Sequence, residues 1–295
     1  MGRLSPAQVL ERYFPDPAPL SPLLARLDRL GQPPAEEAEA DSVLTEEILG
    51  TVEEIIGQGG DRLGAILYSL AQPHKPLLGP LLTRFPLAKQ EAGLALTQFA
   101  RDADDENYPV LDLQRQGLTA VPTGVELAEV PYENIGPDDE PEPYREINLG
   151  YNPITSLSEA DAEALNHFQG IHLIGWKISS LPPEVRLLTS AVMINVSWTE
   201  ISVLPPELFQ LTRLRGLKLN WTAIETIPEE IAALRDLAFI EAAETPFLEL
   251  CWSAQAKEPG HLSDDEREAL RISRILEETG CGIEGLAWNH RRVTG

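Results

Sequence analysis

Histidine, serine and glycine-rich motifs, which carry much of the metal and nucleophilic chemistry of proteins, form no site in this sequence. No serine lies in a G-x-S-x-G elbow, and Gln58-Gly59-Gly60 lacks the Gly-Lys-Ser/Thr of a phosphate-binding loop. No two histidines have the H-x-x-x-H or H-x-H spacing of a metal site. The histidines are His74, His167, His172, His261 and His290. The sequence therefore predicts no metal, no cofactor and no serine nucleophile.

The cysteines point to a reducing environment. The chain has two cysteines, which are too few for a disulfide scaffold. Cys251 and Cys281 lie 30 positions apart, so they also lack the spacing of zinc ligands. The first residues contain no apolar core followed by a cleavage site, and no run approaches the roughly 18 apolar residues of a membrane span. We therefore expect a cytoplasmic protein without a membrane segment.

Charge restricts the class of partner. The chain has 23 basic and 47 acidic residues, a formal net charge of −24. Nucleic acids and anionic membranes attract basic patches, so this balance argues against both as partners. It is compatible with a basic protein partner and also with solubility alone.

A repeat of fixed period organises the middle of the chain. The dipeptides Leu181-Pro182, Leu204-Pro205 and Ile227-Pro228 recur every 23 residues, within blocks that share the pattern L-x-x-L-x-x-L-x-L-x-x-(N/T)-x-L-x-x-L. Pairs such as Ile171 and Leu173 have the two-residue period of a strand, and the prolines suit the start of a short helical turn. One such unit cannot bury its apolar side, whereas stacked units can.

This pattern resembles the leucine-rich repeat of bacterial-type proteins. A fourth block begins at Leu234, and shorter matches at 110–122 and 147–157 bring the total to six repeats. The resemblance implies an α/β leucine-rich-repeat solenoid with parallel strands on its concave face.

The resemblance also implies a column of buried asparagines, but here that column reads Gln116, Asn152, Trp176, Thr199, Thr222 and Thr245. Threonine hydroxyls can satisfy buried backbone groups, whereas Trp176 predicts a local distortion or an indole that reaches a carbonyl.

Three regions follow from these patterns. Residues 1–104 read as an α-helical domain, with a helix from Ser42 to Gly57, helices near 61–71, 75–84 and 87–103, and a linker at 32–41. Residues 105–250 form the solenoid, with an acidic loop insertion at 123–143. Residues 251–295 begin with a loop at 251–261. A capping box from Ser263 to Glu266 then starts a helix that ends near Gly280 and covers the last repeat.

Some bacterial leucine-rich-repeat proteins end in a ubiquitin-ligase domain with a Cys-x-Asp nucleophile. Here Cys251 precedes Trp-Ser and Cys281 precedes Gly-Ile, and only about 45 residues follow the repeats. The motif is absent, so we expect no enzyme.

Residues between the core positions of each strand are predicted to point outward on the concave face. Aromatic residues and methionine gather there amid polar groups, which is the composition of a protein-binding hot spot. The tryptophans could instead only stack on each other and stiffen neighbouring strands. The residues expected on this surface are Tyr151, His172, Met193, Asn195, Trp198, Lys218, Asn220, Trp221, Phe239, Glu241 and Glu244.

The sequence therefore predicts a non-catalytic protein–protein interaction module, such as a scaffold in a bacterial cell. The alternative is an immunity or inhibitor protein that neutralises a basic toxin or nuclease through its acidic surface.

Overall fold

The computed structural model describes residues 42–57, 78–85, 110–128 and 145–284, with single residues at 22, 25, 26, 96 and 286. The chain divides into two compact units, Met1–Asn148 and Leu149–Gly295. Several predictions fall outside the described residues: the linker at 32–41, the helices at 61–71 and 87–103, most of the acidic loop and the end of the C-terminal tail. The domain limits at 104 and 250 stay predictions.

In the first unit, helices α3 (Ser42–Gly57) and α5 (Leu78–Arg84) are joined by ion pairs. The bounds of α3 are those that its apolar spacing predicts. Arg84 donates to Glu46 at 3.1 Å and to Glu53 at 2.7 Å, since two residues seven positions apart lie on one helix face.

Helix α5 approaches the main chain of the first repeat closely. The amide of Gly79 donates to the carbonyl of Gln116 at 2.9 Å. A Cβ atom on Gly79 would lie 2.0 Å from the carbonyl oxygen of Gly117, so this contact requires glycine. Strand β1 (Val110–Asp112) and the short helix η2 (Val125–Leu127) follow, and β1 pairs in parallel with β2 (Glu146–Asn148).

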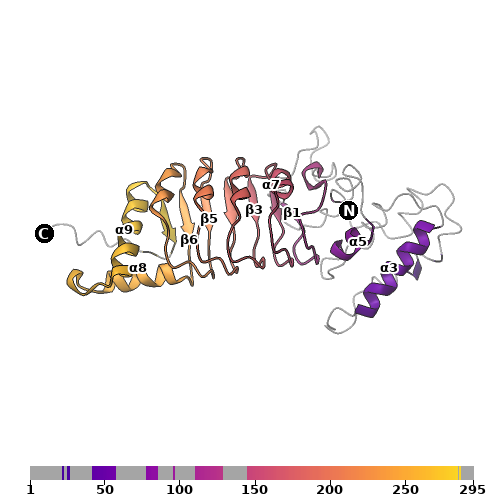
Figure 1. The fold of residues 1–295 in the computed structure, drawn as a ribbon, viewed down its shortest axis with the longest axis horizontal. Coiled ribbons are helices and arrows are strands. Elements are labelled where there is room, and N and C mark those ends of the chain that lie inside the picture. The colour runs from indigo at the N-terminus through magenta and orange to yellow at the C-terminus, as the bar shows by residue number, and fades with distance from the viewer. Residues whose placement is uncertain are drawn as a thin grey trace, which may run out of the picture. The chain divides into compact units, whose positions relative to one another are not determined.

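The second unit confirms the 23-residue period. Strands β3 (Gly170–His172), β4 (Met193–Asn195), β5 (Gly216–Lys218) and β6 (Phe239–Glu241) pair in parallel in sequence order (Figure 1). Residues in register are 23 positions apart, as in the pairs of Gly170 with Met193 and Gly216 with Phe239. The central residue of each strand is fully buried, which places the core behind the sheet. These residues are Ile171, Ile194, Leu217 and Ile240.

Short helices return the chain from one strand to the next. Helix α7 (Glu159–Leu165) precedes β3, and the 3₁₀ helices η4 (Pro183–Leu187), η5 (Pro206–Gln210) and η6 (Glu229–Ala233) follow β3, β4 and β5. Pro183 and Pro206 begin η4 and η5, as the sequence predicts, whereas η6 begins at Glu229. The residue before each of these helices is a proline in an extended conformation. Each 3₁₀ helix buries an apolar side chain against the core: Val185 in η4, Leu208 in η5 and Ile231 in η6. Phe209 of η5 is buried as well.

The threonines of the predicted column satisfy main-chain groups in the same way in each repeat. Thr199, Thr222 and Thr245 donate to carbonyls three residues earlier, at 2.8, 2.7 and 2.6 Å. All three side chains are buried. A threonine hydroxyl thus does here what an asparagine amide does at Asn152, which donates to the carbonyl of Leu149 at 2.9 Å.

The prediction of a loop at 251–261 is wrong for its first half. Helix α8 spans Pro246–Ala256, with Pro246 in its first turn and the Thr245 hydroxyl accepting from the amide of Leu248 at 3.3 Å. Its buried residues Phe247, Leu248, Cys251 and Ala254 have helical spacing. The sequence interpretation missed this helix because it assigned residues up to Leu250 to the last repeat.

The predicted capping box is confirmed, and a strand follows its helix. Ser263 and Glu266 exchange hydrogen bonds at the start of α9 (Asp264–Glu278), after the single turn η7 (Pro259–His261). Strand β7 (Gly282–Glu284), which the sequence analysis did not predict, pairs in parallel with β6. Helix α9 packs on α8, η6 and β7. Its role as a protective cap stays a prediction.

Candidate functional site

One repeat position has a left-handed backbone wherever the structure describes it. It is the residue directly before the asparagine or threonine column, in the turn that follows each strand. Non-glycine residues rarely have positive φ, yet here φ lies between 54° and 61° in every repeat but one, where Gly175 has φ 66°. The non-glycine residues are Arg115, Tyr151, Trp198, Trp221 and Glu244. The backbone therefore favours glycine at this position, and tryptophan there calls for another explanation.

Trp198 and Trp221 stack on each other across neighbouring repeats. Their ring centroids are 4.5 Å apart and the ring planes differ by 13°. Main-chain hydrogen bonds hold both turns, from Trp198 to Asn220 at 2.9 Å and from Trp221 to Ala243 at 2.8 Å. Even so, 52% of Trp198 and 45% of Trp221 remain exposed. The stack predicted as the structural alternative therefore exists, and it leaves about half of each residue open to solvent.

Tyr151 extends this row of rings. A Cβ atom on Gly175 would lie 2.8 Å from the Tyr151 ring, so the ring lies directly over the glycine. Tyr151 is 43% exposed. We call Tyr151, Trp198 and Trp221 the aromatic strip, since they occupy the same position in their repeats. Gly175 occupies that position in the repeat between Tyr151 and Trp198.

On the strands, Phe239 covers a glycine in the same manner. A Cβ atom on Gly216 would lie 2.4 Å from the Phe239 ring, which comes from the neighbouring strand. Met193 is in register with Gly216 on the other side. Phe239 remains 37% exposed and Met193 half-buried. The absence of a side chain at Gly216 therefore provides the space that the far end of the Phe239 ring occupies.

Three of the predicted polar residues form a network with one another. Lys218 and Glu241 are in register on β5 and β6, and their charged groups are 2.8 Å apart. The Asn220 amide donates to Glu241 at 2.9 Å, while its oxygen accepts from the amide of Ala243 at 2.8 Å. These groups already have partners within the chain. They therefore contribute mainly to the shape of the surface and little unpaired charge.

The structure places the predicted residues in two rows. His172, Met193, Asn195, Lys218, Phe239 and Glu241 lie in strands, and Tyr151, Trp198, Asn220, Trp221 and Glu244 lie in the turns that follow. Asn195 is only 8% exposed and accepts from the amide of Ser197 at 3.0 Å, so its side chain has a local structural role. Glu244 is exposed, and His172 is half-buried.

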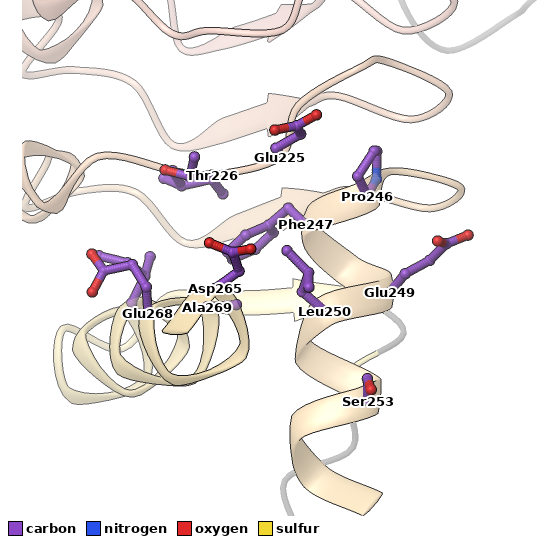
Figure 2. A pocket seen from close by; sticks show the side chains of 12 residues that line it. Glu225, Thr226, Pro246, Phe247, Glu249, Leu250, Ser253, Asp265, Glu268 and Ala269 are labelled. Carbon is purple, nitrogen blue, oxygen red and sulfur yellow. The ribbon is translucent and has the colours of Figure 1, made fainter. Parts of the chain in front are cut away.

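A pocket of about 550 Å³ near the end of the chain was missed by the sequence analysis. The loop before η6, the first turns of α8 and the first half of α9 surround it (Figure 2). Its lining residues are Glu225, Thr226, Ile227, Pro246, Phe247, Glu249, Leu250, Ser253, Asp265, Glu268, Ala269 and Ile272. Its existence depends on α8 being a helix, so an interpretation that placed a loop after Leu250 could not find it.

The titratable groups nearby have strongly perturbed pKa values. Hydrogen bonds from Lys257, from the Ser253 hydroxyl and from the Ser263 amide lower the pKa of Glu266 to about 2. Burial raises the pKa of Cys251 to about 12 and that of Cys281 to about 11. Both thiols are therefore protonated at neutral pH, which makes them poor nucleophiles and metal ligands.

Metal sites and membrane-spanning helices were the remaining possibilities in the described part of the chain. No group of three or more His, Cys, Asp or Glu residues there could hold a metal ion. Among the helices described, none is both long enough and apolar enough to cross a membrane.

Comparisons with known proteins found similarity among solved structures. No protein-family model and no curated protein matches this chain. A leucine-rich-repeat protein of Leptospira interrogans is similar in structure, with 24% sequence identity and a TM-score of 0.43. The match covers 65% of this chain and 39% of that one, so this chain spans less than half of that protein's length. The 23-residue sequence pattern and the matching register of the parallel strands give this chain the α/β fold of a leucine-rich-repeat solenoid.

Proposed function

We propose that this protein is a protein–protein interaction module whose partner binds at the aromatic strip. The observation that carries the proposal is the exposed stack of Trp198 on Trp221, held at two positions where the backbone favours glycine. A non-glycine residue in the left-handed region costs about 1–2 kcal/mol. Exposed tryptophans at strained positions are therefore a reason to expect a functional surface.

The geometry suits recognition of a protein surface. Tryptophan and tyrosine are enriched in binding hot spots, where truncation of one residue costs about 2 kcal/mol or more. Two rings fixed by stacking and by main-chain hydrogen bonds lose little conformational freedom when a partner covers them. The ring of Tyr151 over Gly175 is restricted in the same way.

Affinity capture from the native host with mass spectrometry tests the proposal. The baits are the unmodified protein, the double variant Trp198→Gly/Trp221→Gly, and Arg115→Gly as a control for glycine at the same backbone position. We expect a partner that the unmodified and Arg115→Gly baits retain and the tryptophan variant loses. Equal capture by all three baits would place the binding site elsewhere.

The net charge of −24 favours a second candidate, an inhibitor that neutralises a basic toxin or nuclease. Charge attraction mainly accelerates association and is screened over about 8–10 Å at physiological salt. For such a partner, the association rate should fall steeply between low and physiological ionic strength. The dissociation rate should respond mainly to the tryptophan changes, so rates measured at two salt concentrations separate the two contributions.

A further inference from the structure

We propose that the pocket between α8, α9 and the loop before η6 receives an arginine or lysine side chain of a partner protein. This contact would be distinct from the aromatic strip.

The floor of the pocket is apolar. Ile227, Phe247 and Ile272 line it and are almost completely buried, so they form a rigid base. Leu250 and Pro246 are half-buried and present apolar atoms toward the opening. Its volume of about 550 Å³ exceeds what one side chain needs, which leaves room for flanking groups of the same segment.

The rim is negatively charged. Glu225, Glu249, Asp265 and Glu268 line the pocket, and no lysine, arginine or histidine among the described residues does (Figure 2). Glu268 is already paired with Arg271 at 2.7 Å. For Glu225, Glu249 and Asp265, the described part of the chain shows no basic partner, so three carboxylates remain to attract a cation.

An anionic ligand does not fit this pocket, although the N-termini of two helices adjoin it. In each helix, a first-turn amide is already bound by the side chain of the residue before the helix. Leu248 donates to the hydroxyl of Thr245, and Glu266 donates to the hydroxyl of Ser263. The carboxylates of Glu249 and Asp265 lie in the first turns of α8 and α9, where they offset the positive ends of the helix dipoles.

A basic side chain matches both parts of the site. Its aliphatic stem can pack on Phe247, Leu250 and Ala269, while its charged end remains near the carboxylates and solvent. Arginine fits better than lysine, because its planar guanidinium can bind carboxylates through two hydrogen bonds.

Methyl NMR with a defined probe tests the proposal. The probe is a short acetylated and amidated peptide with one arginine between two leucines, and its matched control carries citrulline, which is uncharged and nearly isosteric, in place of arginine. We expect the arginine peptide to shift the methyl signals of Leu250, Ala269 and Ile272. The citrulline peptide should bind at least about fivefold more weakly.

Two triple variants separate the pocket from the general acidity of the chain. Glu225→Gln/Glu249→Gln/Asp265→Asn should weaken binding of the arginine peptide at least about fivefold. The control, Glu163→Gln/Glu200→Gln/Glu278→Gln, removes the same charge from exposed residues away from the pocket and should change affinity less than about twofold. Thermal melting shows that each variant is folded.

Several outcomes would overturn the proposal: equal binding of both peptides, equal weakening by both triple variants, shifts confined to other methyl groups, or no shift at millimolar peptide. The Trp198→Gly/Trp221→Gly variant should bind the peptide normally. A loss of partner capture without a loss of peptide binding, or the reverse, therefore distinguishes failure of one site from failure of the other.

Discussion

The indole nitrogen of Trp176 donates a hydrogen bond to the main-chain carbonyl of Leu149 at 3.0 Å, across 27 positions of the chain. Trp176 is only 1% exposed and occupies the column that holds asparagine or threonine in the neighbouring repeats. Those residues donate within their own repeat, whereas Trp176 reaches back one repeat and joins Asn152 on the same oxygen. The expectation that the indole reaches a carbonyl is confirmed.

Sharing of one acceptor predicts non-additive stability losses. Trp176→Phe or Asn152→Ala alone leaves the Leu149 carbonyl with one of these two donors, whereas the double variant removes both. An unsatisfied buried polar group costs about 1–3 kcal/mol. The double variant should therefore lose at least about 1 kcal/mol more than the sum of the single variants, measured by urea unfolding as a double-mutant cycle. Additive losses would mean that another group satisfies the carbonyl.

Gly79 should tolerate no side chain. A Cβ atom there would lie 2.0 Å from the main-chain oxygen of Gly117. Because both sides of this contact are main chain, relieving the clash requires a backbone shift. We expect Gly79→Ala to reduce the free energy of unfolding by about 2 kcal/mol or more. Gly50→Ala is the matched control in helix α3, where no atom lies within 4 Å of the new Cβ. It should stabilise by about 0.5–1 kcal/mol, and a similar effect at both positions would contradict the close approach of α5.

The periodic part of the chain was predictable because its signal repeats. The 23-residue register and the Thr199, Thr222 and Thr245 hydrogen bonds follow from positions that recur in the sequence. Strand β7 was not predictable in this way, since three residues after a helix are too few to show a period.

The candidate surface was only partly predictable. Counting positions identified the column that contains Trp198 and Trp221, but its left-handed turns are a property of the main chain. Sequence alternation placed these residues on strands, whereas each strand ends three positions before its tryptophan. The network of Lys218, Asn220 and Glu241 depends on which rotamers face one another, and a sequence pattern does not specify that.

Glu266 should make the protein less stable in acid. Its pKa falls from the usual 4.5 to about 2 in the folded protein, so the folded state favours the ionised carboxylate. This contribution is fully present above about pH 4.5 and is lost as the pH falls toward 2. We expect Glu266→Gln to flatten the decline of unfolding free energy between pH 5 and 2, measured by urea titration. Glu277→Gln, an exposed change in the same helix, is the control, and an equal flattening by both variants would contradict a special role of Glu266.

The thiols of Cys251 and Cys281 should be inert in the native protein. Both are buried, and burial raises their pKa values to about 12 and 11, so little thiolate forms at pH 8. A chromogenic disulfide reagent should label neither cysteine within minutes, and should label both once urea unfolds the chain. Rapid labelling of the native protein would show that the C-terminal part of the second unit opens readily.

The left-handed turns predict an inverted order of glycine and alanine stability at the aromatic strip. In an exposed helix, glycine is less stable than alanine by about 1 kcal/mol. At Trp221, with φ 54°, alanine keeps the strain that glycine relieves, so Trp221→Gly should be more stable than Trp221→Ala by up to about 1 kcal/mol. The exposed residue Arg274 in helix α9 provides the control. There, the Arg274→Ala variant should be more stable than the Arg274→Gly variant. Thermal and urea unfolding of the four variants measures both differences. The same order at both positions would mean that the turn relaxes when the indole is removed, and that the Trp198 stack imposes the backbone conformation.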